Sequence, residues 1–385
     1  MTDRLQYSVV AAIDPATAEH RFVVVGSDEV LHYEASLWLV FLLALGRSPN
    51  TAREYGRRVA WFLSWCSGVV DWRGITLSHL VMWRRALAGR EAKGSASVTI
   101  CMAAVRSFYE WCDGRGLLTT DVVSKMTQLK YFAPGTRGGG ERGVRRRVLV
   151  EELRADPVEP APPRWIDDET ARNRLAGLEL PTRDRFLVDL LSTTGIRVGE
   201  ALSLFTADLH FGGGSRQLGC GLRDPHFHVR VDNPVENEAR AKGGPRTLFV
   251  HRDLIESYVD YVLERRKILS QARIEDRCPH VFVNLYTEGR WLGRAASYST
   301  VKRLMDRCSK RIGYDITGPH TLRHTFATRL VRGLGCDPVP LDVVQALLGH
   351  AVLTSTQVYT HDAEAAMKKA TIAMTARSLT LGGTR

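Results

Sequence analysis

Four short segments of the chain carry residues whose types suit chemistry at a phosphodiester. They read "TTGIRVGEALSL", "AKGGPRTLFV", "GPHTLRHTFATRLV" and "LLGHAVLTSTQVYTHDAE". A nucleophile can cut a phosphodiester when fixed cations neutralise the charge that builds on the non-bridging oxygens. Arginine suits this task because a guanidinium binds two oxygens at once and keeps its proton. The candidate site residues in these segments are Arg197, Glu200, Lys242, His320, Arg323, His324, His350 and Tyr359.

Tyr359 is the predicted nucleophile because its sequence neighbours are polar, whereas a core tyrosine normally keeps apolar company on one helical face. Other tyrosines of the second half lack a Gly-His pair at the same upstream spacing. A phenol is weakly acidic, so it needs a base or a strongly electropositive site. His320 lies three residues before Arg323 and could supply base or hydrogen-bonding help. These competing tyrosines are Tyr258, Tyr261, Tyr286, Tyr298 and Tyr314.

The remaining candidates have roles that follow from their chemistry. Arg197 and Arg323 are the expected clamp, and Lys242 is the expected general acid, because it lies in a turn before a strand between the two arginine segments. Glu200 is expected to orient an arginine or a histidine. Arg197 and Glu200 could instead form a surface ion pair at i, i+3.

A metal site is not expected from these residues. His320 and His324 have i, i+4 spacing, yet a Thr follows His320 where a zincin has Glu. The seven cysteines include no C-x-x-C pair, which favours a reduced chain without structural zinc. We therefore expect neither a metal nor a cofactor.

The elements that must position these residues fall into a mainly helical chain with a small sheet in its C-terminal domain. A chain of 385 residues accommodates two domains. Residues 1–33 contain two β-rich segments that suit a hairpin, and residues 34–130 have helical periodicity, with Ser48 and Asn50 flanking Pro49 as a helix start. Residues 165–385 carry the candidate site, between helical segments and the small sheet.

Residues 131–164 are rich in Gly, Pro and Arg and lack periodicity, which indicates a linker between the domains. The chain has 53 Lys and Arg against 42 Asp and Glu, and the resulting charge of +11 favours a polyanionic partner. A solvated tether remains the alternative for the linker. Its arginines are candidates for phosphate contacts: Arg137, Arg142, Arg145, Arg146 and Arg147.

The four segments, in this order, resemble the tyrosine recombinases, also called phage integrases. The resemblance rests on Gly-x-Arg-x-x-Glu, His-x-x-Arg-His, Leu-Gly-His and a tyrosine nine residues after that histidine. It covers about residues 34–376, with the last 200 carrying the specific match. It implies a helical core-binding domain at 34–130 and a catalytic domain at 165–385, and it makes His350 a hydrogen-bond donor to the scissile phosphate.

The resemblance also implies a mechanism and partners. Tyr359 would form a 3′-phosphotyrosine, and a 5′ hydroxyl of a partner strand would then attack that linkage without any nucleotide cofactor. Four protomers would pair two double-stranded DNA sites, with accessory proteins as further partners. The segment after Tyr359 would dock on a neighbouring protomer or, alternatively, pack on its own domain.

The extended linker and the insertion "FGGGSRQLGCGLRDPHFH" point away from a minimal chromosome-dimer resolvase and towards an integrase or transposase of a mobile element. A bacterial, cytoplasmic, nucleoid-associated location follows, with no membrane partner, since the longest apolar run, 37–45, is far shorter than a membrane span. A type IB topoisomerase-like enzyme and a noncatalytic DNA-binding regulator on the same scaffold are the alternatives.

Overall fold

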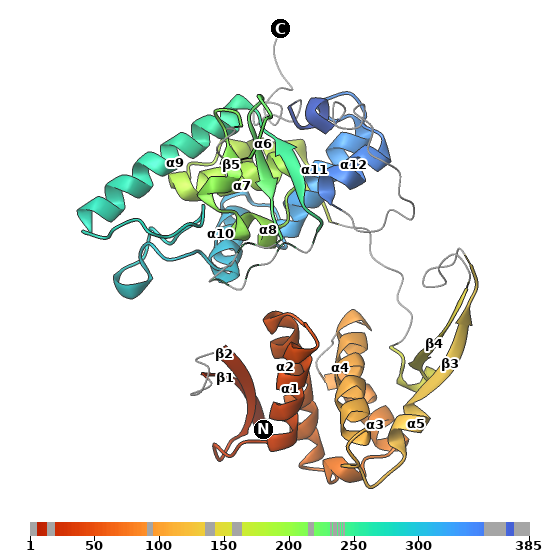
Figure 1. The fold of residues 1–385 in the computed structure, drawn as a ribbon. Coiled ribbons are helices and arrows are strands. Elements are labelled where there is room, and N and C mark those ends of the chain that lie inside the picture. The colour runs from red at the N-terminus through yellow and green to blue at the C-terminus, as the bar shows by residue number, and fades with distance from the viewer. Residues whose placement is uncertain are drawn as a thin grey trace. The chain divides into compact units, whose positions relative to one another are not determined.

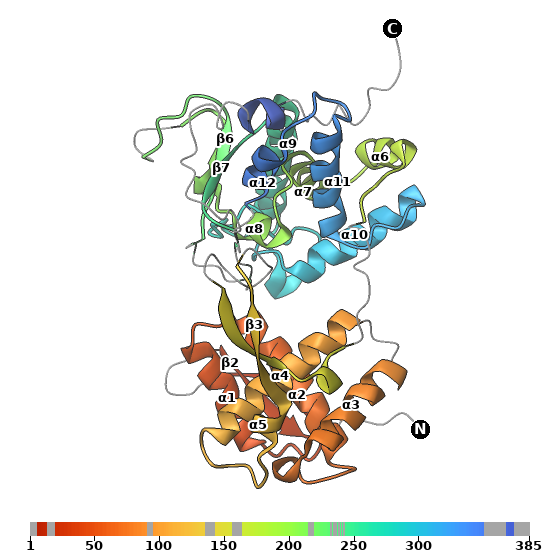
Figure 2. The ribbon, with the colours of Figure 1, turned by 90° about the vertical axis from the view of Figure 1, so that its right-hand side faces the viewer.

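The fold was analysed in a computed structural model, which describes residues 6–13, 20–90, 95–134, 143–155, 164–214, 219–231, 233, 237, 239, 241, 243–349 and 367–372. The chain divides into two compact units, Met1–Pro160 and Ala161–Arg385, and the division falls within the segment 131–164. Each unit has its own hydrophobic core. Figures 1 and 2 show both units from two directions.

The first unit is a set of helices with two added hairpins. The predicted N-terminal hairpin is confirmed, since β1 and β2 pair antiparallel from Tyr7↔Gly26 to Ile13↔His20. Its core is aromatic and includes Trp38, Phe62 and Phe108, each fully buried. Its elements are β1 (Tyr7–Ile13), β2 (His20–Gly26), α1 (Tyr33–Ala44), α2 (Pro49–Cys66), η1 (Trp72–Gly74), α3 (Leu77–Arg90), α4 (Ser95–Asp113), α5 (Val122–Met126), β3 (Thr127–Phe132), β4 (Val144–Leu149) and η2 (Glu151–Leu153).

Local sequence signals define several helix ends in this unit. The predicted start at Pro49 is confirmed, because the Ser48 side chain accepts a hydrogen bond from the Thr51 amide at 3.1 Å and Pro49 occupies the first helical position. His32 caps α1 in the same way, accepting from the Ala35 amide.

The segment expected to be an irregular linker contains regular structure in its described part. Val144–Leu149 forms β4, which pairs antiparallel with β3, and Leu153 after it is fully buried in the first core. The three successive arginines of β4 hide the strand from a pattern search, because they leave no alternation of apolar and polar residues. The two strands together form the β3–β4 ribbon, which extends from the helices of its unit (Figure 1).

The second unit packs helices around a small antiparallel sheet of order β5-β6-β7. The helices α11 and α12 lie beside each other in both views (Figures 1 and 2), and α11 also packs on α7. Its elements are α6 (Glu169–Ala176), α7 (Thr182–Thr194), α8 (Val198–Ser203), η3 (Thr206–Asp208), β5 (Leu209–His210), β6 (His226–Val229), β7 (Arg246–Phe249), α9 (Arg252–Gln271), η5 (Gly289–Trp291), α10 (Tyr298–Ile312), α11 (Pro319–Arg332) and α12 (Leu341–Leu348).

A short helical segment, 367–372, lies against its own unit. Ala370 belongs to the second core, and Lys368 pairs with Asp224 while its ammonium lies 5.7 Å from the centre of the Phe249 ring. The described part of the C-terminal segment therefore packs on its own unit, and docking of the segment on a neighbouring protomer stays a prediction. Among the described residues, no helix combines the length and apolarity needed to span a bilayer.

Candidate functional site

Arg197 is held at a helix start by the break that follows α7. Gly195 ends α7 in the left-handed conformation, with φ of +62°. A Cβ at this position would lie 2.3 Å from the Phe326 ring, so both the backbone angle and the packing require glycine. Arg197 then caps α8, and its amide donates to Oε2 of Glu200 at 2.9 Å.

Glu200 is the buried centre of an arginine cluster. Its side chain is fully buried, and Oε1 accepts from Nη1 of Arg197 at 3.0 Å. Arg246 donates Nη2 to Oε2 at 2.7 Å and Nη1 to Oε1 at 3.2 Å, which is a bidentate pair. Burial alone would raise the pKa of the Glu200 carboxyl, but the hydrogen bonds and charge of Arg246, together with Arg197, hold that pKa below its usual value. The surface ion-pair alternative therefore does not describe this glutamate.

Arg323 reaches the same place from α11. Its guanidinium is buried and donates Nη1 to the carbonyl of Gly195 at 2.7 Å and Nη2 to the carbonyl of Leu348 at 2.6 Å. Nη1 of Arg197 also donates to Leu348, at 3.1 Å. Burial, followed by the charge of Arg197, lowers the pKa of Arg323 to about 9, so the guanidinium is still charged at neutral pH. The two arginines therefore meet at one carbonyl in the last turn of α12.

His320 and His324 lie on successive turns of α11, with ring centres 5.7 Å apart. Desolvation by the surrounding protein, followed by the charges of His324, Arg323 and Arg197, lowers the pKa of His320. Its side chain nevertheless remains exposed to solvent. The lowered pKa favours the neutral imidazole of His320, which is open on one side and one helical turn from Arg323.

Three of the predicted site residues, Lys242, His350 and Tyr359, lie outside the described residues, as do Arg137 and Arg142. Gly243 and Gly349, which adjoin the first two in the chain, are described. A Cβ at Gly243 would lie 2.8 Å from Nη1 of Arg197, and one at Gly349 would lie 2.7 Å from Nη1 of Arg246. Both glycines therefore border the arginine cluster.

Comparison with protein-family models identifies both units. The model described as "Phage integrase family" matches residues 169–366, which is more than half of the chain. The chain belongs to the phage integrase family. A second model, "Phage integrase, N-terminal SAM-like domain", matches residues 36–116 of this integrase-family chain.

Its curated relatives are tyrosine recombinases. The chain is 32% identical over 335 residues to the tyrosine recombinase XerC of Mycobacterium bovis, covering 85% of this chain and 92% of that protein. It is 31% identical over 331 residues to the tyrosine recombinase XerC of Rhodospirillum centenum, covering 83% of this chain and 80% of that protein. A solved lambda integrase dimer bound to a COC′ core site matches with a TM-score of 0.52 and 18% identity, over 87% of this chain and 76% of that one, and thus shares the fold.

Arg246 is a member of the arginine cluster of this phage integrase family chain that sequence reasoning did not single out. It lies in the segment "AKGGPRTLFV", where only Lys242 was singled out. Its guanidinium also donates Nε to the carbonyl of Leu347 at 2.9 Å and is 7% exposed. A single arginine at a strand start has no spacing signal, so only its pairing with Glu200 reveals its role.

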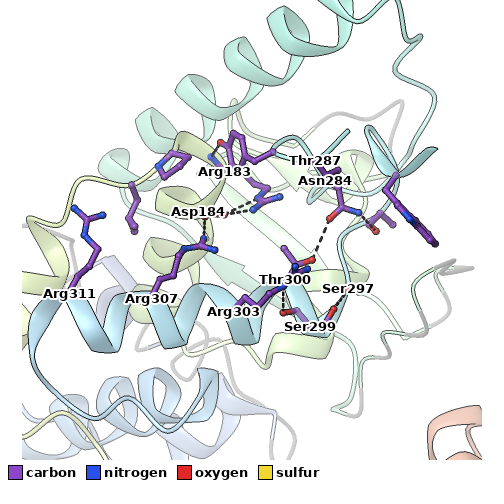
Figure 3. Close-up of a pocket in the computed structure, with 15 residues that line it drawn as sticks. Arg183, Asp184, Asn284, Thr287, Ser297, Ser299, Thr300, Arg303, Arg307 and Arg311 are labelled. Atoms are coloured by element: carbon purple, nitrogen blue, oxygen red, sulfur yellow. Dashed lines mark hydrogen bonds and ion pairs between the residues drawn. The ribbon is translucent and has the colours of Figure 1, made fainter. Parts of the chain in front are cut away.

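A cavity of about 730 Å³ is separate from the arginine cluster. Figure 3 shows Arg303, Arg307 and Arg311 along one face of α10, where their i, i+4 spacing lines them up beside it. Arg307 is 55% exposed and pairs with the buried Asp184. This row gives the second unit a basic surface in addition to the cluster.

The β3–β4 ribbon gives the first unit a basic surface. Arg145, Arg146 and Arg147 are exposed on β4, and Arg146 is directly opposite Lys130 of β3. Like charges directly opposite in a sheet repel each other and destabilise the pair. A bound polyanion would relieve this repulsion, so the ribbon suits the phosphate contacts predicted for these three arginines.

Proposed function

We propose that this integrase-family chain is a site-specific DNA recombinase that cleaves and rejoins strands through a 3′-phosphotyrosine at Tyr359. One observation carries the proposal: Arg197 and Arg323, from different helices, meet at the Leu348 carbonyl. The chain continues from there through His350 to Tyr359. Cations and nucleophile would thus be supplied at one end of α12.

The arginines would bind the two non-bridging oxygens of the scissile phosphate. A guanidinium has five N–H donors, and Nη1 of Arg197 uses its two on protein oxygens, which leaves three for a substrate. Fixed donors stabilise the charge that develops in the transition state without reorganising at that moment. Glu200 and Arg246 would be positioning residues, because they hold Arg197 and contact no substrate.

Tyr359 would reach this phosphate on the chain that leaves Gly349. Ten residues span at most about 33–36 Å, which is ample for attack within the same protomer or on a neighbouring one. The neutral imidazole of His320 would accept a hydrogen bond or the proton from the phenol, and His350 would donate to the phosphate. The pKa direction of His320 supports this assignment, because a protonated imidazole could not accept.

Lys242 would protonate the departing 5′ oxygen. Its neighbour Gly243 borders Arg197, which supports placing the ammonium near the phosphate. The phosphotyrosine retains the energy of the broken ester, so rejoining by a 5′ hydroxyl requires no nucleotide cofactor. No step in this sequence calls for a metal ion at the phosphate.

Duplex DNA would contact both units through their basic surfaces. Arg145, Arg146 and Arg147 of the ribbon, together with Arg137 and Arg142 between its strands, would contact phosphates, which position the protein without reading sequence. Recombination at paired sites would require four protomers, with accessory proteins as further partners. The location would be the bacterial cytoplasm, at the nucleoid.

The biological role we propose is integration or excision of a mobile element. The long connection between β5 and β6, 211–225, and the β3–β4 ribbon support it, because we interpret both as additions to a minimal recombinase. Action at a site in the host chromosome is the second candidate, supported by the coverage of 92% of the tyrosine recombinase XerC of Mycobacterium bovis.

The test is to incubate the chain with fragmented DNA of its host and its mobile elements, without added divalent cations. The protein is then denatured and the covalently bound DNA is sequenced. Tyr359→Phe should lose the adduct and keep DNA binding, whereas Tyr298→Phe, at a tyrosine that is 54% exposed, should retain it. Adducts that persist in Tyr359→Phe would refute the nucleophile.

The same preparation separates the alternatives. Resolution of a synthetic Holliday junction by tetramers indicates a recombinase, whereas relaxation of supercoiled DNA by monomers indicates a topoisomerase. A DNA-binding regulator would form no adduct on any fragment. Lys242→Ala should cleave slowly and recover on a 5′-bridging phosphorothiolate, whose leaving group needs no proton; without recovery, another residue is the acid.

A further inference from the structure

Four potential metal ligands gather at the sheet of the second unit, and none of them is a predicted catalytic residue. They are His210 on β5, His226 and His228 on β6, and Cys220 in the connection between these strands. One ligand atom from each lies within 4.8 Å of all the others. His226, His210 and Cys220 are 0%, 3% and 8% exposed, and His228 is half-buried. Figures 1 and 2 show the three strands that bring them together.

Two of the distances between ligand atoms are close to those of one tetrahedral ion. Zn²⁺ binds imidazole nitrogen at about 2.0–2.1 Å and thiolate sulfur at about 2.3 Å, so adjacent ligand atoms of a tetrahedral site are about 3.3–3.6 Å apart. Here Nε2 of His226 lies 3.3 Å from Nε2 of His228 and 3.2 Å from Sγ of Cys220. The three ring centres are 4.8–4.9 Å apart with steep interplanar angles, so the rings surround a common point.

The outward ring nitrogens have partners that direct the other nitrogens inward. Nδ1 of His226 lies 2.7 Å from the carbonyl of Asp224, and Nε2 of His210 lies 3.2 Å from the carbonyl of Ala207. A carbonyl only accepts, so these nitrogens carry the proton and the opposite nitrogen presents a lone pair. Such orienting contacts are typical of histidines that bind a metal.

Nδ1 of His228 lies 3.1 Å from Oγ1 of Thr247 on β7, and this contact orients the ring. A hydroxyl can donate or accept, so either ring nitrogen of His228 can carry the proton. Its Nε2 then faces Nε2 of His226. Since two lone pairs at 3.3 Å repel, the pair requires a proton or a cation between them.

A hydrogen-bonded network without metal leaves one ligand unsatisfied. Nδ1 of His210 is buried and has no hydrogen-bond partner in the described chain. Nε2 of His226 has a single lone pair, yet both His228 and the Cys220 thiol lie within hydrogen-bond distance of it. One cation would satisfy all four inward atoms.

We propose that His210, Cys220, His226 and His228 bind one Zn²⁺ in a closed structural site. Three imidazoles and a thiolate suit zinc, and four protein ligands leave no open position for substrate. Cys220 loses its thiol proton when the ion binds. The proposal departs from the sequence expectation of no structural zinc, which rested on the absence of C-x-x-C spacing.

The ion would crosslink β5, β6 and the connection between them, in the sheet whose third strand carries Arg246. Cys220 ties the long β5–β6 connection to the strands, and Thr247 links the site to β7. The residue before Thr247 is Arg246, which pairs with Glu200. Zinc would therefore stabilise the strand that supports the cluster while lying apart from the proposed chemistry.

The first measurement is the metal content of the full-length chain, expressed without a histidine tag and purified without chelators. Inductively coupled plasma mass spectrometry should find one zinc ion per chain. Replacing zinc by Co²⁺ should give the intense visible bands of tetrahedral cobalt and a thiolate-to-cobalt charge-transfer band. If the chain holds no zinc after equilibration with one equivalent and desalting, or if the cobalt spectrum lacks either feature, the proposal is wrong.

Variants assign the ligands. Cys220→Ser should abolish the charge-transfer band, and His228→Gln should reduce zinc to the background of the preparation, whereas Cys336→Ser, at a half-buried cysteine outside the cluster, should retain one zinc. Thr247→Val removes the partner of His228 and should weaken zinc binding about 10–100-fold. Wild-type zinc content in Cys220→Ser would overturn the assignment, and if a variant fails to fold, the wild-type cobalt spectrum decides.

Discussion

Glu200→Gln is the substitution that most directly tests the arginine cluster. It preserves the shape of a fully buried side chain and removes its charge. Glu200 accepts four hydrogen bonds, from Nη1 and Nη2 of Arg246 and from the backbone and Nη1 of Arg197. The amide end of glutamine would face guanidinium donors and lose about half of these bonds.

The expected cost follows from burial. Removing one partner of a buried ion pair costs about 3–5 kcal/mol because a charge remains unpaired. Arg246 is 7% exposed, but Arg197 is 22% exposed and keeps part of its hydration. We therefore expect the lower end, about 3 kcal/mol of unfolding free energy of the second unit.

Hydrogen exchange followed by mass spectrometry measures this unit inside the whole chain. Peptides from α7 should exchange about two orders of magnitude faster in Glu200→Gln, since 1.4 kcal/mol corresponds to tenfold. Peptides from α4 serve as the internal reference. Glu256→Gln, in an ion pair with exposures of 84% and 62%, should change α7 exchange less than about threefold. Unchanged α7 exchange in Glu200→Gln would refute the reasoning.

The pH dependence of the unfolding free energy provides an independent check that the charged form of Glu200 is stabilising. The pKa of Glu200 is lowered in the folded chain, so its stabilisation is complete above the ordinary value of 4.5. That stabilisation is lost as the pH falls through the lowered folded-state pKa. Because protonated glutamate resembles glutamine, the difference between wild type and Glu200→Gln should vanish there. A difference that grows on acidification would contradict the charged cluster.

Three further experiments test the backbone requirement at Gly195, the lowered pKa of His320 and the phosphate contacts of the β3–β4 ribbon. Gly195→Ala should cost about 2–5 kcal/mol, from the left-handed backbone and the clash with a buried ring, measured by α7 exchange. The single-turnover cleavage rate should fall with acid only below pH 6.5, because the pKa of His320 is lowered. Replacing Arg145, Arg146 and Arg147 by Gln should reduce the salt slope of DNA binding by about 0.9 per lost phosphate contact.

Each of these perturbations has a matched control. Gly313→Ala has φ of +68° and no atom within 4 Å of the new Cβ, so it should cost only about 1–2 kcal/mol. His324→Gln removes a group that lowers the pKa of His320 and should move the acid limb to higher pH. Arg252→Gln, far from the ribbon in sequence, should leave the salt slope unchanged. Three results would contradict the assigned causes: equal effects of Gly195→Ala and Gly313→Ala, an acid limb that does not move in His324→Gln, or a salt slope that Arg252→Gln lowers as much as the ribbon variant does.

Recognisable spacing led the sequence reasoning to several candidate residues that the structure brings together. Arg197 with Glu200 and His320 with Arg323 are three residues apart, and the structure brings Arg197, Glu200 and Arg323 into one network. The helix break at Gly195 was also visible, because Thr-Thr-Gly interrupts an apolar run. These features depend on residues that are close in the sequence, so sequence patterns can predict them.

Contacts set by strand pairing could not be predicted in this way. Arg246 meets Glu200 across 46 residues, and the zinc ligands come from a sheet whose register places His228 opposite Thr247. A search for C-x-x-C spacing assumes that ligands are close in sequence, whereas His210 and Cys220 are ten residues apart. The ribbon was missed for a different reason, since its arginines suit either a strand or a tether.

Arg197 and Arg323 share the carbonyl of Leu348, and this affects which substitutions the site can tolerate. A backbone oxygen cannot be removed by changing the side chain, so many residues at 348 would preserve the meeting point of the two cations. The residue type that the site requires is at the next position. Gly349 ends α12 with φ of +61° and leaves room for Arg246. Part of this site is therefore specified by a residue that has no side chain.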